Sequence, residues 1–200
     1  MVYVKRVVRL LATIAVLPAF LAYHAESLLL GPEKSFPGWS QAFSLIPGLC
    51  GVYLRLAFYR LVLARCAPDA CVEFGTIFSH PGARVGRGAN VGAYCCLGEV
   101  ELGDDVLLAS HVSITSGSRL HGIERLDVPI RMQPGVRSLV RVGEDSWIGE
   151  RAVVMADVGR HCVVGAGAVV TRPIPDYAIA VGVPAKVIGY RNKPQEGDAS

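Results

Sequence analysis

Side chains able to carry out acid–base chemistry gather in one stretch of this 200-residue chain, residues 115–140. His121 lies in this stretch, and four arginines accompany it: Arg119, Arg125, Arg131 and Arg137. An imidazole titrates near neutral pH and can accept or donate a proton during a reaction. A guanidinium forms paired hydrogen bonds with phosphates and carboxylates. The stretch therefore combines a proton-transfer group with groups that bind anions.

The cysteines give no second chemical centre. The six cysteines include no CxxC pair and have no histidine partner at zinc-binding spacing. We expect free thiols in a reducing compartment, with the adjacent Cys95 and Cys96 as small buried residues. The net charge of +3 is mild, and the sequence has no basic run with interleaved aromatic residues. These features argue against a nucleic-acid partner.

A six-residue repeat supplies the framework for these side chains, most clearly over residues 142–170. It consists of an aliphatic residue followed by a small one. The pairs are Val85-Gly86, Val91-Gly92, Leu97-Gly98, Leu102-Gly103, Leu108-Ala109, Val142-Gly143, Ile148-Gly149 and Val164-Gly165. Such a period fits neither an amphipathic helix nor an alternating strand, but is typical of a β-solenoid whose coils have three flat sides. The aliphatic residue would fill the interior, and the small one would lie at a bend that has no room for a larger side chain.

The repeat also predicts where the chain leaves the solenoid. Inward positions continue to Ile114, with one shortened step between Leu97 and Leu102, and the next inward residue is Val142. The next inward position, expected near residue 120, is delayed by about 22 residues, so the segment 115–140 is expected to leave the coil as a loop. Insertions in solenoids commonly lie on the working face. After Val170 we expect the repeat to end, because prolines stop strand formation.

The first 70 residues are apolar and are expected to be largely helical. The charge-free segment Leu10–Tyr23 is shorter than the ~20 residues needed to span a bilayer. Pro18 is expected to kink it. The segment Gly31–Trp39 is rich in turn-forming residues, and a second helix is predicted to begin near Gly51.

Two roles are open for this N-terminal segment. Arginines among aromatic residues, here Arg55, Arg60 and Arg65, suit a membrane interface where their charged groups reach lipid phosphates. This would place the protein on the cytoplasmic face of the inner membrane. Alternatively, the helices cover an open end of the solenoid in a cytoplasmic protein. A signal peptide would also have a basic start and an apolar centre, but no small-x-small cleavage site follows.

The chain thus divides into three parts. Residues 1–70 form a helical segment with membrane contact, residues 71–191 form a β-helix domain carrying the loop 115–140, and residues 192–200 form a polar tail. The expected fold class is mainly β with N-terminal α-helices.

Four motifs resemble those of a known family. They are LGDDVLLASHVSI, SWIGERAVV, VVGAGAVVTRPIPDYAIAVGVPAKVI and the histidine-bearing loop between the first two. Over residues 85–191 the chain resembles the hexapeptide-repeat O-acetyltransferases of the xenobiotic, galactoside and maltose type. The resemblance implies a left-handed parallel β-helix, a homotrimer, and acetyl-CoA as acyl donor between adjacent subunits. It implies no metal.

The resemblance also suggests the catalytic base. In that family a loop histidine takes a proton from the acceptor hydroxyl, which then attacks the thioester, and such a base contributes about 10²–10⁴-fold. The usual motif places this histidine just after a glycine. Here Ser118 occupies that place and His121 matches a second histidine of the motif. We assign the base to His121, with His111, expected on the surface near the loop root, as the second candidate.

The donor site is carried over residue by residue. Trp147 matches the family's tryptophan beside the catalytic loop. The remaining matches are Gly149, Ala166 and Thr171 along the pantetheine arm, and Arg172 and Lys186 at the nucleotide phosphates. Cations suit the latter role because phosphate favours charge-assisted hydrogen bonds.

The acceptor is expected to be a small-molecule or lipid-linked saccharide. Asn90 and Glu99, in coils expected to face the loop, would bind sugar hydroxyls, and Arg119 would face a pyrophosphate or an acidic sugar. The predicted activity is O-acetylation of a sugar hydroxyl in polysaccharide or glycolipid biosynthesis.

Three alternatives remain. The first is N-acetylation of an amino sugar, and the second is a scaffold without catalytic activity. The third is a γ-type carbonic anhydrase, which would need zinc on His80, His111 and His121.

Overall fold

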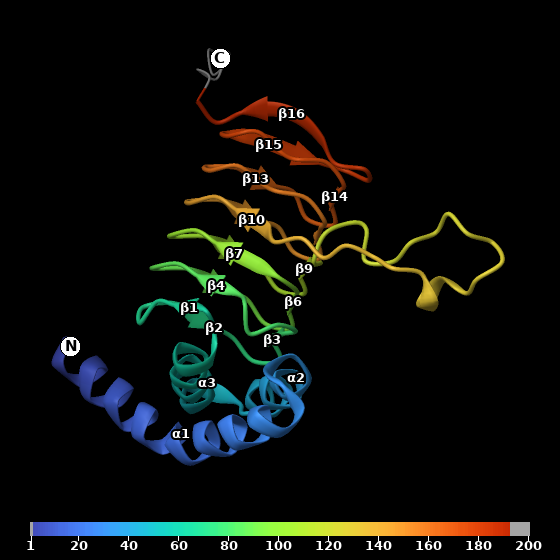
Figure 1. The fold of residues 1–200 in the computed structure, drawn as a ribbon. Helices are drawn as coiled ribbons and strands as arrows, with labels where there is room; N and C mark the ends of the chain where they lie inside the picture. Colours follow the sequence, from blue (N-terminus) through green and yellow to red (C-terminus); the bar gives the residue numbers. More distant parts are fainter. Residues whose placement is uncertain (1, 193–200) are drawn as a thin grey trace, which may run out of the picture.

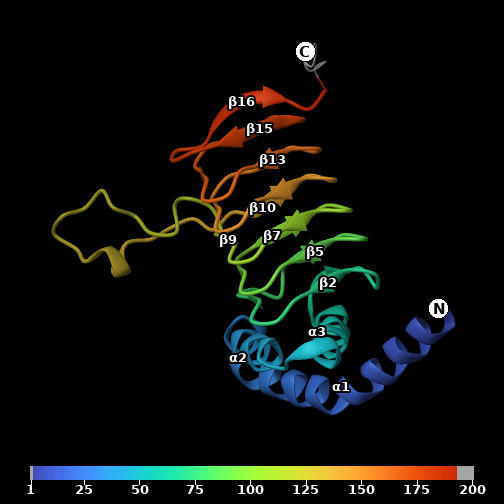
Figure 2. The same ribbon diagram turned by 180° about the vertical axis from the view of Figure 1, so that it is seen from behind.

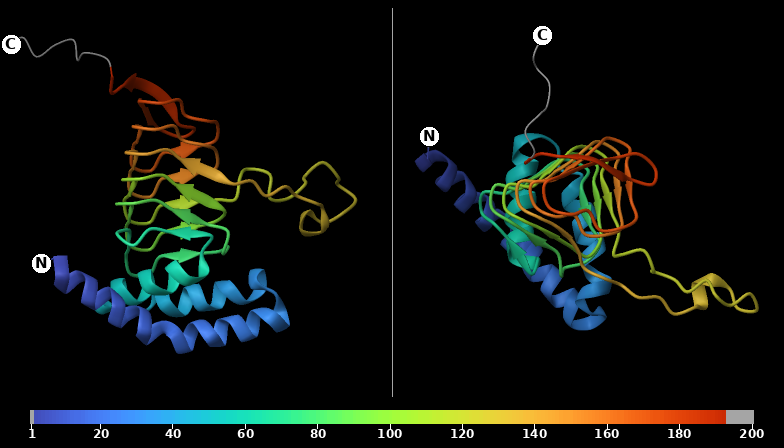
Figure 3. Two further views of the ribbon diagram at one scale, coloured as in Figure 1. Left: turned by 60° about the vertical axis from the view of Figure 1, so that its left-hand side comes forward. Right: turned by 90° about the horizontal axis from the view of Figure 1, so that it is seen from above.

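A three-sided β-solenoid stands on a layer of three helices in the computed structural model, which describes residues 2–192 (Figure 1). Seen along its axis, the solenoid is a stack of triangular coils (Figure 3). Each side is a sheet whose successive strands pair in parallel. We name the sides sheets A, B and C in the order in which the chain visits them.

Sheet A consists of β1 (Arg65–Cys66), β4 (Arg84–Val85), β7 (Val100–Leu102) and β10 (Val140–Val142). Sheet B consists of β2 (Cys71–Val72), β5 (Asn90–Val91), β8 (Leu107–Leu108), β11 (Trp147–Ile148), β13 (Val163–Val164), β15 (Ala178–Val181) and β16 (Lys186–Tyr190). Sheet C consists of β3 (Ile77–Phe78), β6 (Cys96–Leu97), β9 (Ser113–Ile114), β12 (Val153–Val154) and β14 (Val169–Val170).

The repeat is read correctly from the sequence. The predicted inward residues are all at most 2% exposed and fill the interior: Val85, Val91, Leu97, Leu102, Leu108, Ile114, Val142, Ile148 and Val164. Sheet pairing stacks equivalent residues of successive coils, as in the column that joins Val91, Leu108 and Ile148. The shortened step therefore alters the corner between two sides without disturbing the stack.

Gly149 shows why a small residue follows the aliphatic one. A Cβ atom at this position would lie 2.5 Å from the backbone nitrogen of Ala166 in the next coil. Real Cβ atoms do not approach so closely, and a backbone atom cannot rotate away. The stacking of one corner on the next therefore excludes even a methyl group at this corner.

A Gly149→Ala variant is expected to lower the free energy of unfolding by about 2–3 kcal/mol, because overpacking forces the backbone apart. Gly189→Ala is the matched control, since an added Cβ there has no atom within 4 Å. Thermal or denaturant unfolding of both variants measures the difference. Equal stabilities for the two variants would contradict this account of the repeat.

The coil is interrupted once and ends later than predicted. Between β9 and β10 the chain leaves the corner of sheets C and A as a long loop, residues 115–139, which we call the arm. The arm contains one turn of 3₁₀ helix, η1 (Ile130–Met132). The expectation that the repeat ends after Val170 is wrong. Ile174 still bridges to Val158, and β15 pairs in parallel with β13. Strand β16 then turns back antiparallel to β15 (Figure 2).

The helices are α1 (Val2–Leu30), α2 (Pro32–Ser44) and α3 (Gly48–Val62). Helices α2 and α3 pack against the first coil and cover its open end (Figure 3), which confirms that these helices cap the solenoid. The turn predicted over Gly31–Trp39 is wrong, because Pro32 lies at the start of a helix, where its fixed φ is favourable. Burial of Phe36 and Ser40 then outweighs the low helix propensity of Pro37 and Gly38.

An aromatic cluster joins this cap to the solenoid. The rings of Phe43 and Phe58 stack with centroids 4.2 Å apart, and Tyr59 meets Phe78 of the first coil edge-to-face at 4.9 Å. The hydroxyl groups of Tyr59 and Ser40 lie 2.9 Å apart, within hydrogen-bond distance. The cap and the coil therefore share one continuous apolar core.

Arg55 is part of this core, and its expected place at a membrane interface is wrong. The residue is fully buried. Its guanidinium donates to the backbone oxygen of Val72 and to the oxygens of Phe43, Ser44 and Ile46 at the end of α2. Burial lowers the pKa of Arg55. The side chain closes the carbonyl end of α2 against the solenoid.

Helix α1 lies across the base of the cap and curves along its length (Figures 1 and 3). It includes Pro18 without interruption. The residues Lys5–Leu30 are long and apolar enough to cross a membrane by length and composition, although only 17% of their most apolar window is buried. The helix thus extends beyond the charge-free segment defined from the sequence, because it continues through His24 and Glu26.

Candidate functional site

A pocket of about 320 Å³ lies at the root of the arm, where sheet C turns into sheet A. Its floor comes from the coils, and its rim comes from the arm. The lining residues are Ser79, His80, Cys96, Gly98, Ser113, Ile114, Thr115, Ser116, Leu120, His121 and Arg137. Two imidazoles and three hydroxyl-bearing serines thus border one space.

The pocket is held open by hydrogen bonds at the arm root. The Ser116 hydroxyl, which is almost fully buried, accepts a hydrogen bond of 2.9 Å from the backbone N–H of Glu99. Thr115 donates from its hydroxyl to the backbone oxygen of Gly117. His121 follows on the exposed side, so its imidazole is free to meet a substrate.

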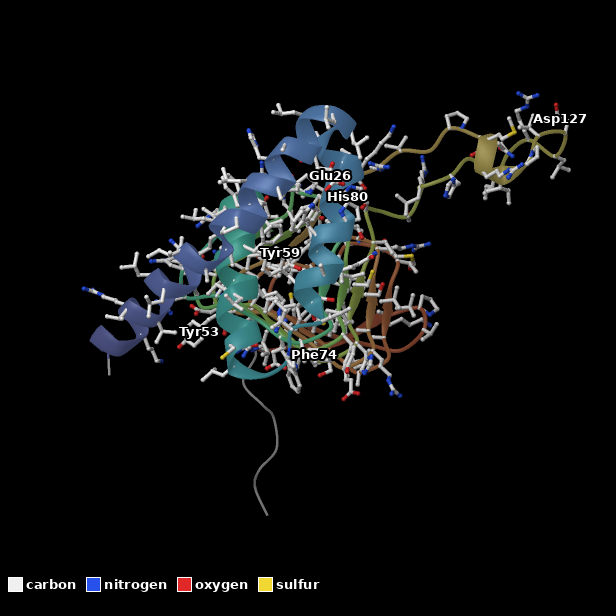
Figure 4. The ribbon with its side chains drawn as sticks, turned by 90° about the horizontal axis from the view of Figure 1, so that it is seen from below. Glu26, Tyr53, Tyr59, Phe74, His80 and Asp127 are labelled. Carbon is white, nitrogen blue, oxygen red and sulfur yellow. The ribbon has the colours of Figure 1, made fainter. Side chains whose placement is uncertain are left out.

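His80 also lines this pocket, although no catalytic motif surrounds it in the sequence. Its Nδ1 lies 2.7 Å from a carboxylate oxygen of Glu33, in the first turn of α2. Arg137 of the arm lies 3.6 Å from the same oxygen. Figure 4 shows His80 between α2 and the coils, beside the root of the arm. A carboxylate only accepts hydrogen bonds, so Nδ1 carries the hydrogen and Nε2 remains for a ligand.

We predict that Glu33 positions His80 for the acetyl transfer that the motifs imply, so Glu33→Ala is expected to lower kcat about 10-fold with little change in the KM for acetyl-CoA. Glu33→Gln should retain more activity, with kcat lowered less than about 3-fold, because its amide oxygen can still accept the hydrogen bond. Steady-state kinetics measure both. Glu101→Ala is the matched control, since Glu101 pairs with Arg84 and Arg141 on sheet A, outside the lining of the pocket. Equal losses for Ala and Gln would contradict the role of this hydrogen bond.

Glu99 and Arg119 lie near the pocket, whereas His111 does not. Glu99 occupies the corner position beneath Ser116, and the exposed Arg119 lies in the arm next to Leu120. His111 lies at the corner of sheets B and C, one side away from the arm, so its expected place near the loop root is wrong. There its ring stacks on Tyr94 with centroids 5.2 Å apart.

Trp147 and Asn90 lie on the outer face of sheet B, in one column with Leu107 between them. Asn90 therefore does not face the arm of its own chain. The indole of Trp147 is half exposed and borders a second pocket of about 330 Å³. The lining residues of this pocket are Asp105, Leu107, Asp145, Ser146, Trp147, Val163 and Arg191. It offers an apolar wall with charged groups at one end.

The charged end of this second pocket is a small network. The carboxylate of Asp145 lies 2.9 Å from Nδ1 of His161 and 3.2 Å from Nη1 of Arg191. The hydrogen bond from His161, with Arg191 beside it, holds the pKa of Asp145 below its ordinary value. The cation of Arg191 is thus partly neutralised within the chain.

The other residues matched to the donor site border sheet C or lie at the top of the coil. Gly149 and Ala166 stack on each other at the corner of sheets B and C. The exposed Thr171 and Arg172 follow β14 at the corner that also carries the arm root, and Lys186 is exposed on β16. Within one chain these residues do not converge on a single pocket.

The three outer faces differ in charge. Sheet A carries outward ion pairs, with Glu101 lying 3.5 Å from Arg84 and 3.6 Å from Arg141. On sheet B, Lys186 is exposed on the antiparallel strand β16. The outward residues of the parallel strands of sheets B and C carry no charge. They are Cys71, Asn90, Leu107, Trp147, Val163 and Ile179 on sheet B, and Ile77, Cys96, Ser113, Val153 and Val169 on sheet C. Sheet A is suited to solvent, and the other two are suited to contact.

Comparison with known proteins identifies the fold and the chemistry. Residues 140–172 match the family described as bacterial transferase hexapeptide (six repeats). The chain is 37% identical to a probable acetyltransferase of Mycobacterium tuberculosis over 134 residues, which is 62% of this chain but only 43% of that protein. It is 33% identical over 178 residues to a putative lipopolysaccharide biosynthesis O-acetyl transferase of Escherichia coli K12, covering 72% of this chain and 91% of that protein.

Solved structures agree. A maltose O-acetyltransferase from Clostridium difficile 630 superposes with a TM-score of 0.68 at 23% identity, covering 80% of this chain and 89% of that one. A galactoside acetyltransferase in complex with coenzyme A gives 0.67 at 24% identity, covering 80% and 82%. These likenesses establish the left-handed β-helix expected from the motifs. With the repeat, the fold and the similarity along nearly the whole length of the Escherichia coli protein, the chain belongs to the hexapeptide-repeat acetyltransferase family.

Proposed function

We propose that this protein transfers the acetyl group of acetyl-CoA to a sugar hydroxyl, with His121 as the base. The observation that carries the proposal is the pocket at the arm root, which is lined by His121, His80 and the serines at sheet C. Similarity to a putative lipopolysaccharide biosynthesis O-acetyl transferase and to a galactoside O-acetyltransferase supports a hydroxyl on a sugar as the acceptor.

The chemistry follows from the two reacting groups. A neutral hydroxyl is a weak nucleophile, and His121 would accept its proton as the oxygen attacks the thioester carbon. The carbonyl oxygen gains negative charge in the tetrahedral intermediate and needs a hydrogen-bond donor. Collapse of this intermediate breaks the carbon–sulfur bond, and the imidazolium can return the proton to the leaving thiolate. The products are the acetylated sugar and free CoA.

We infer a homotrimer in which sheet B of one subunit faces sheet C of the next. The uncharged outward residues of the parallel strands of these sheets support this arrangement, and the ion pairs of sheet A would then remain in solvent. The corner of sheets B and C would point to the three-fold axis. The pocket with His121 in one subunit would then adjoin the pocket with Trp147 in its neighbour, so that neither subunit alone has a complete site.

The residues fit acetyl-CoA in this assembly. Leu107, Trp147 and Val163 supply an apolar wall for the pantetheine arm. Thr171 and the stacked corner of Gly149 and Ala166 border the facing sheet C, where backbone groups would meet the arm. Arg172 and Lys186, both exposed, would bind the nucleotide phosphates. In this arrangement Asn90 and Trp147 are together on the side that faces the neighbour's arm.

We propose a lipid-linked saccharide as the acceptor and the cytoplasmic face of the membrane as the location. The exposed apolar side chains of α1, such as Leu10, Leu21 and Leu28, support membrane contact. The arm carries Arg119 and Arg131, both exposed, which would meet a pyrophosphate or an acidic sugar. Glu99, beside the arm root, would accept a hydrogen bond from a sugar hydroxyl.

The test is thiol release from acetyl-CoA by wild-type protein with three acceptor sets: neutral sugars, amino sugars and extracted lipid-linked glycans. Release that depends on a hydroxyl acceptor supports the proposal. Release with amino sugars alone would assign N-acetylation instead. Analytical ultracentrifugation in mild detergent tests the assembly, and a monomer that turns over at the full rate would overturn the shared site.

A further inference from the structure

Three arginines of the N-terminal helices line one pocket that the proposed acetyl transfer does not use. Arg6 and Arg9 come from α1, and Arg60 comes from α3. Leu10, Thr13 and Pro68 complete the lining of this space of about 500 Å³. Arg6, Arg9 and Thr13 recur at steps of three and four residues, so they lie on one side of α1.

The cations of this pocket have no acidic partner among the described residues. No ion pair forms at Arg6, Arg9 or Arg60 within residues 2–192, whereas most arginines of the solenoid contact a carboxylate. The Nε of Arg9 is also shielded from solvent and lacks a hydrogen-bond partner in the described structure. Three guanidinium groups with unused donors form a site for a phosphate group.

An apolar surface lies directly beside this pocket. The side of α1 facing away from the cap presents a row of exposed aliphatic side chains. They are Val7, Leu10, Leu11, Ile14, Leu17, Leu21, Leu28 and Leu29, between 42% and 85% exposed. Leu10 belongs both to this row and to the arginine pocket. On the other flank of the row, Val8, Ala12 and Ala15 form an apolar groove with Leu49 and Tyr53 of α3.

The packing of α1 fixes how this surface is presented. Ala12, Val16 and Tyr23 are buried against the cap, and the Tyr23 ring meets Phe36 and Phe58 edge-to-face. Nε1 of Trp39 donates to Glu26 at 2.7 Å. The helix therefore lies crosswise under the solenoid (Figure 3). Its apolar row is exposed on the side opposite the buried residues. A helix spanning a bilayer would have to leave these contacts.

We propose that Arg6, Arg9 and Arg60 bind the phosphate of an anionic phospholipid headgroup while the apolar row of α1 lies in the membrane interface. This inference rests on the membrane contact proposed above and adds which residues bind which lipid group. An amphipathic helix lying in the interface buries its apolar side among the acyl chains, and flanking cations reach the headgroups. Arg6 and Arg9 lie on the side of α1 that adjoins its apolar row, and Arg60 of α3 lies beside them.

The experiment is vesicle co-sedimentation of the full-length protein at fixed ionic strength. Vesicles contain either neutral phosphatidylcholine or phosphatidylcholine with a third phosphatidylglycerol. Wild type is expected to bind the anionic vesicles at least about 10-fold more tightly. The Arg6→Gln/Arg9→Gln/Arg60→Gln variant is expected to bind them about 10–100-fold more weakly, since each basic residue near the surface contributes several-fold. Leu10→Ser/Ile14→Ser should lose binding to both vesicle types.

The matched control is Arg84→Gln/Arg151→Gln/Arg160→Gln, which removes the same charge from the solenoid. It should stay within about 5-fold of wild type, because charges beyond the Debye length are screened. The single variant Arg60→Gln changes one exposed residue and is expected to fold even if the triple variant does not. It should still bind the anionic vesicles several-fold more weakly than wild type. Equal binding by wild type and both arginine variants would overturn the proposal.

Two further measurements distinguish a lipid phosphate from a soluble phosphate, and lipid binding from enzymatic activity. Isothermal titration with pyrophosphate, followed by vesicle binding in its presence, tests for a soluble ligand. Pyrophosphate binding without vesicle binding would assign the pocket to a soluble anion and overturn the lipid proposal. Acetyl transfer to a soluble sugar is measured on the same preparations. If the triple arginine variant loses vesicle binding but acetylates the sugar at the wild-type rate, both the lipid site and the acetyl transfer are supported. If the wild-type protein shows no acetyl transfer, only the proposed enzymatic function is refuted.

Discussion

Replacing His121 with alanine is expected to lower kcat for sugar acetylation by about 10²–10⁴-fold, which is the range for loss of a general base. The KM for acetyl-CoA should change little, because His121 would act on the acceptor hydroxyl. Steady-state thiol release with saturating acetyl-CoA measures the effect. The loss should be smaller for a more acidic acceptor hydroxyl, which needs less help in losing its proton.

His111→Ala is the control for this experiment. His111 is exposed and stacks on Tyr94 at a different corner of the coil, so its removal should change kcat less than about 3-fold. A full loss of activity in His111→Ala together with an active His121→Ala would transfer the base to His111. Equal activity in both variants would favour an amine acceptor, which attacks without a strong base.

Arg55→Leu is expected to lower the free energy of unfolding by about 3–5 kcal/mol. The substitution removes hydrogen bonds to the oxygens of Phe43, Ile46 and Val72 and leaves these buried acceptors without their charged donor. Denaturant unfolding at fixed protein concentration measures the change, since the stability of an oligomer depends on protomer concentration. The cap should loosen first, which hydrogen exchange at α2 would report.

Arg60→Gln is the matched control because it changes an exposed arginine of the same helix. We expect it to shift the free energy of unfolding by less than about 0.5 kcal/mol. Arg55→Lys should fall between the two, since an ammonium cannot reproduce the fork of donors that contacts several carbonyls. If Arg55→Leu were as stable as the control, the guanidinium would not be needed to join α2 to the coil.

The solenoid could be predicted in detail because its physical rule is local. Each aliphatic residue needs an interior and each following corner needs a small residue, so the period alone located Val85, Ile114 and Val142. The same rule located the arm as a break in the period. It failed near Ile174, because prolines on either side still permit a single bridging residue in the stack.

The cap could be predicted less well because its structure depends on contacts between distant segments. Proline and glycine in the segment 31–39 predict a turn locally, and burial of Phe36 against the cap makes it a helix. Glu33 is then carried to His80, 47 positions along the chain. The six-residue repeat places His80, Glu99 and Ser116 at equivalent corner positions of successive coils. This alignment could have identified His80 as a residue of the pocket from the sequence.

Arg55 and Arg60 show the limit of reading charge from sequence. They lie one and a half turns apart on α3 and look alike in a linear pattern. One is buried with four backbone oxygens around it, and the other is exposed at the arginine pocket. The sequence records the residue type but not whether a neighbouring helix end supplies acceptors.

Additional elements cover the first coil of the stack and the last parallel strands of sheets B and C. At one end, α2 and α3 cover the first coil. At the other, β16 runs antiparallel along β15, and the turn after β15 covers β14 through the hydrogen bond from Ala185 N–H to the Val169 oxygen. Unpaired parallel strands at an open end would act as templates for further chains and lead to fibres. Among the described residues these elements therefore disfavour end-to-end growth through sheets B and C, and we expect copies of the protein to associate side by side.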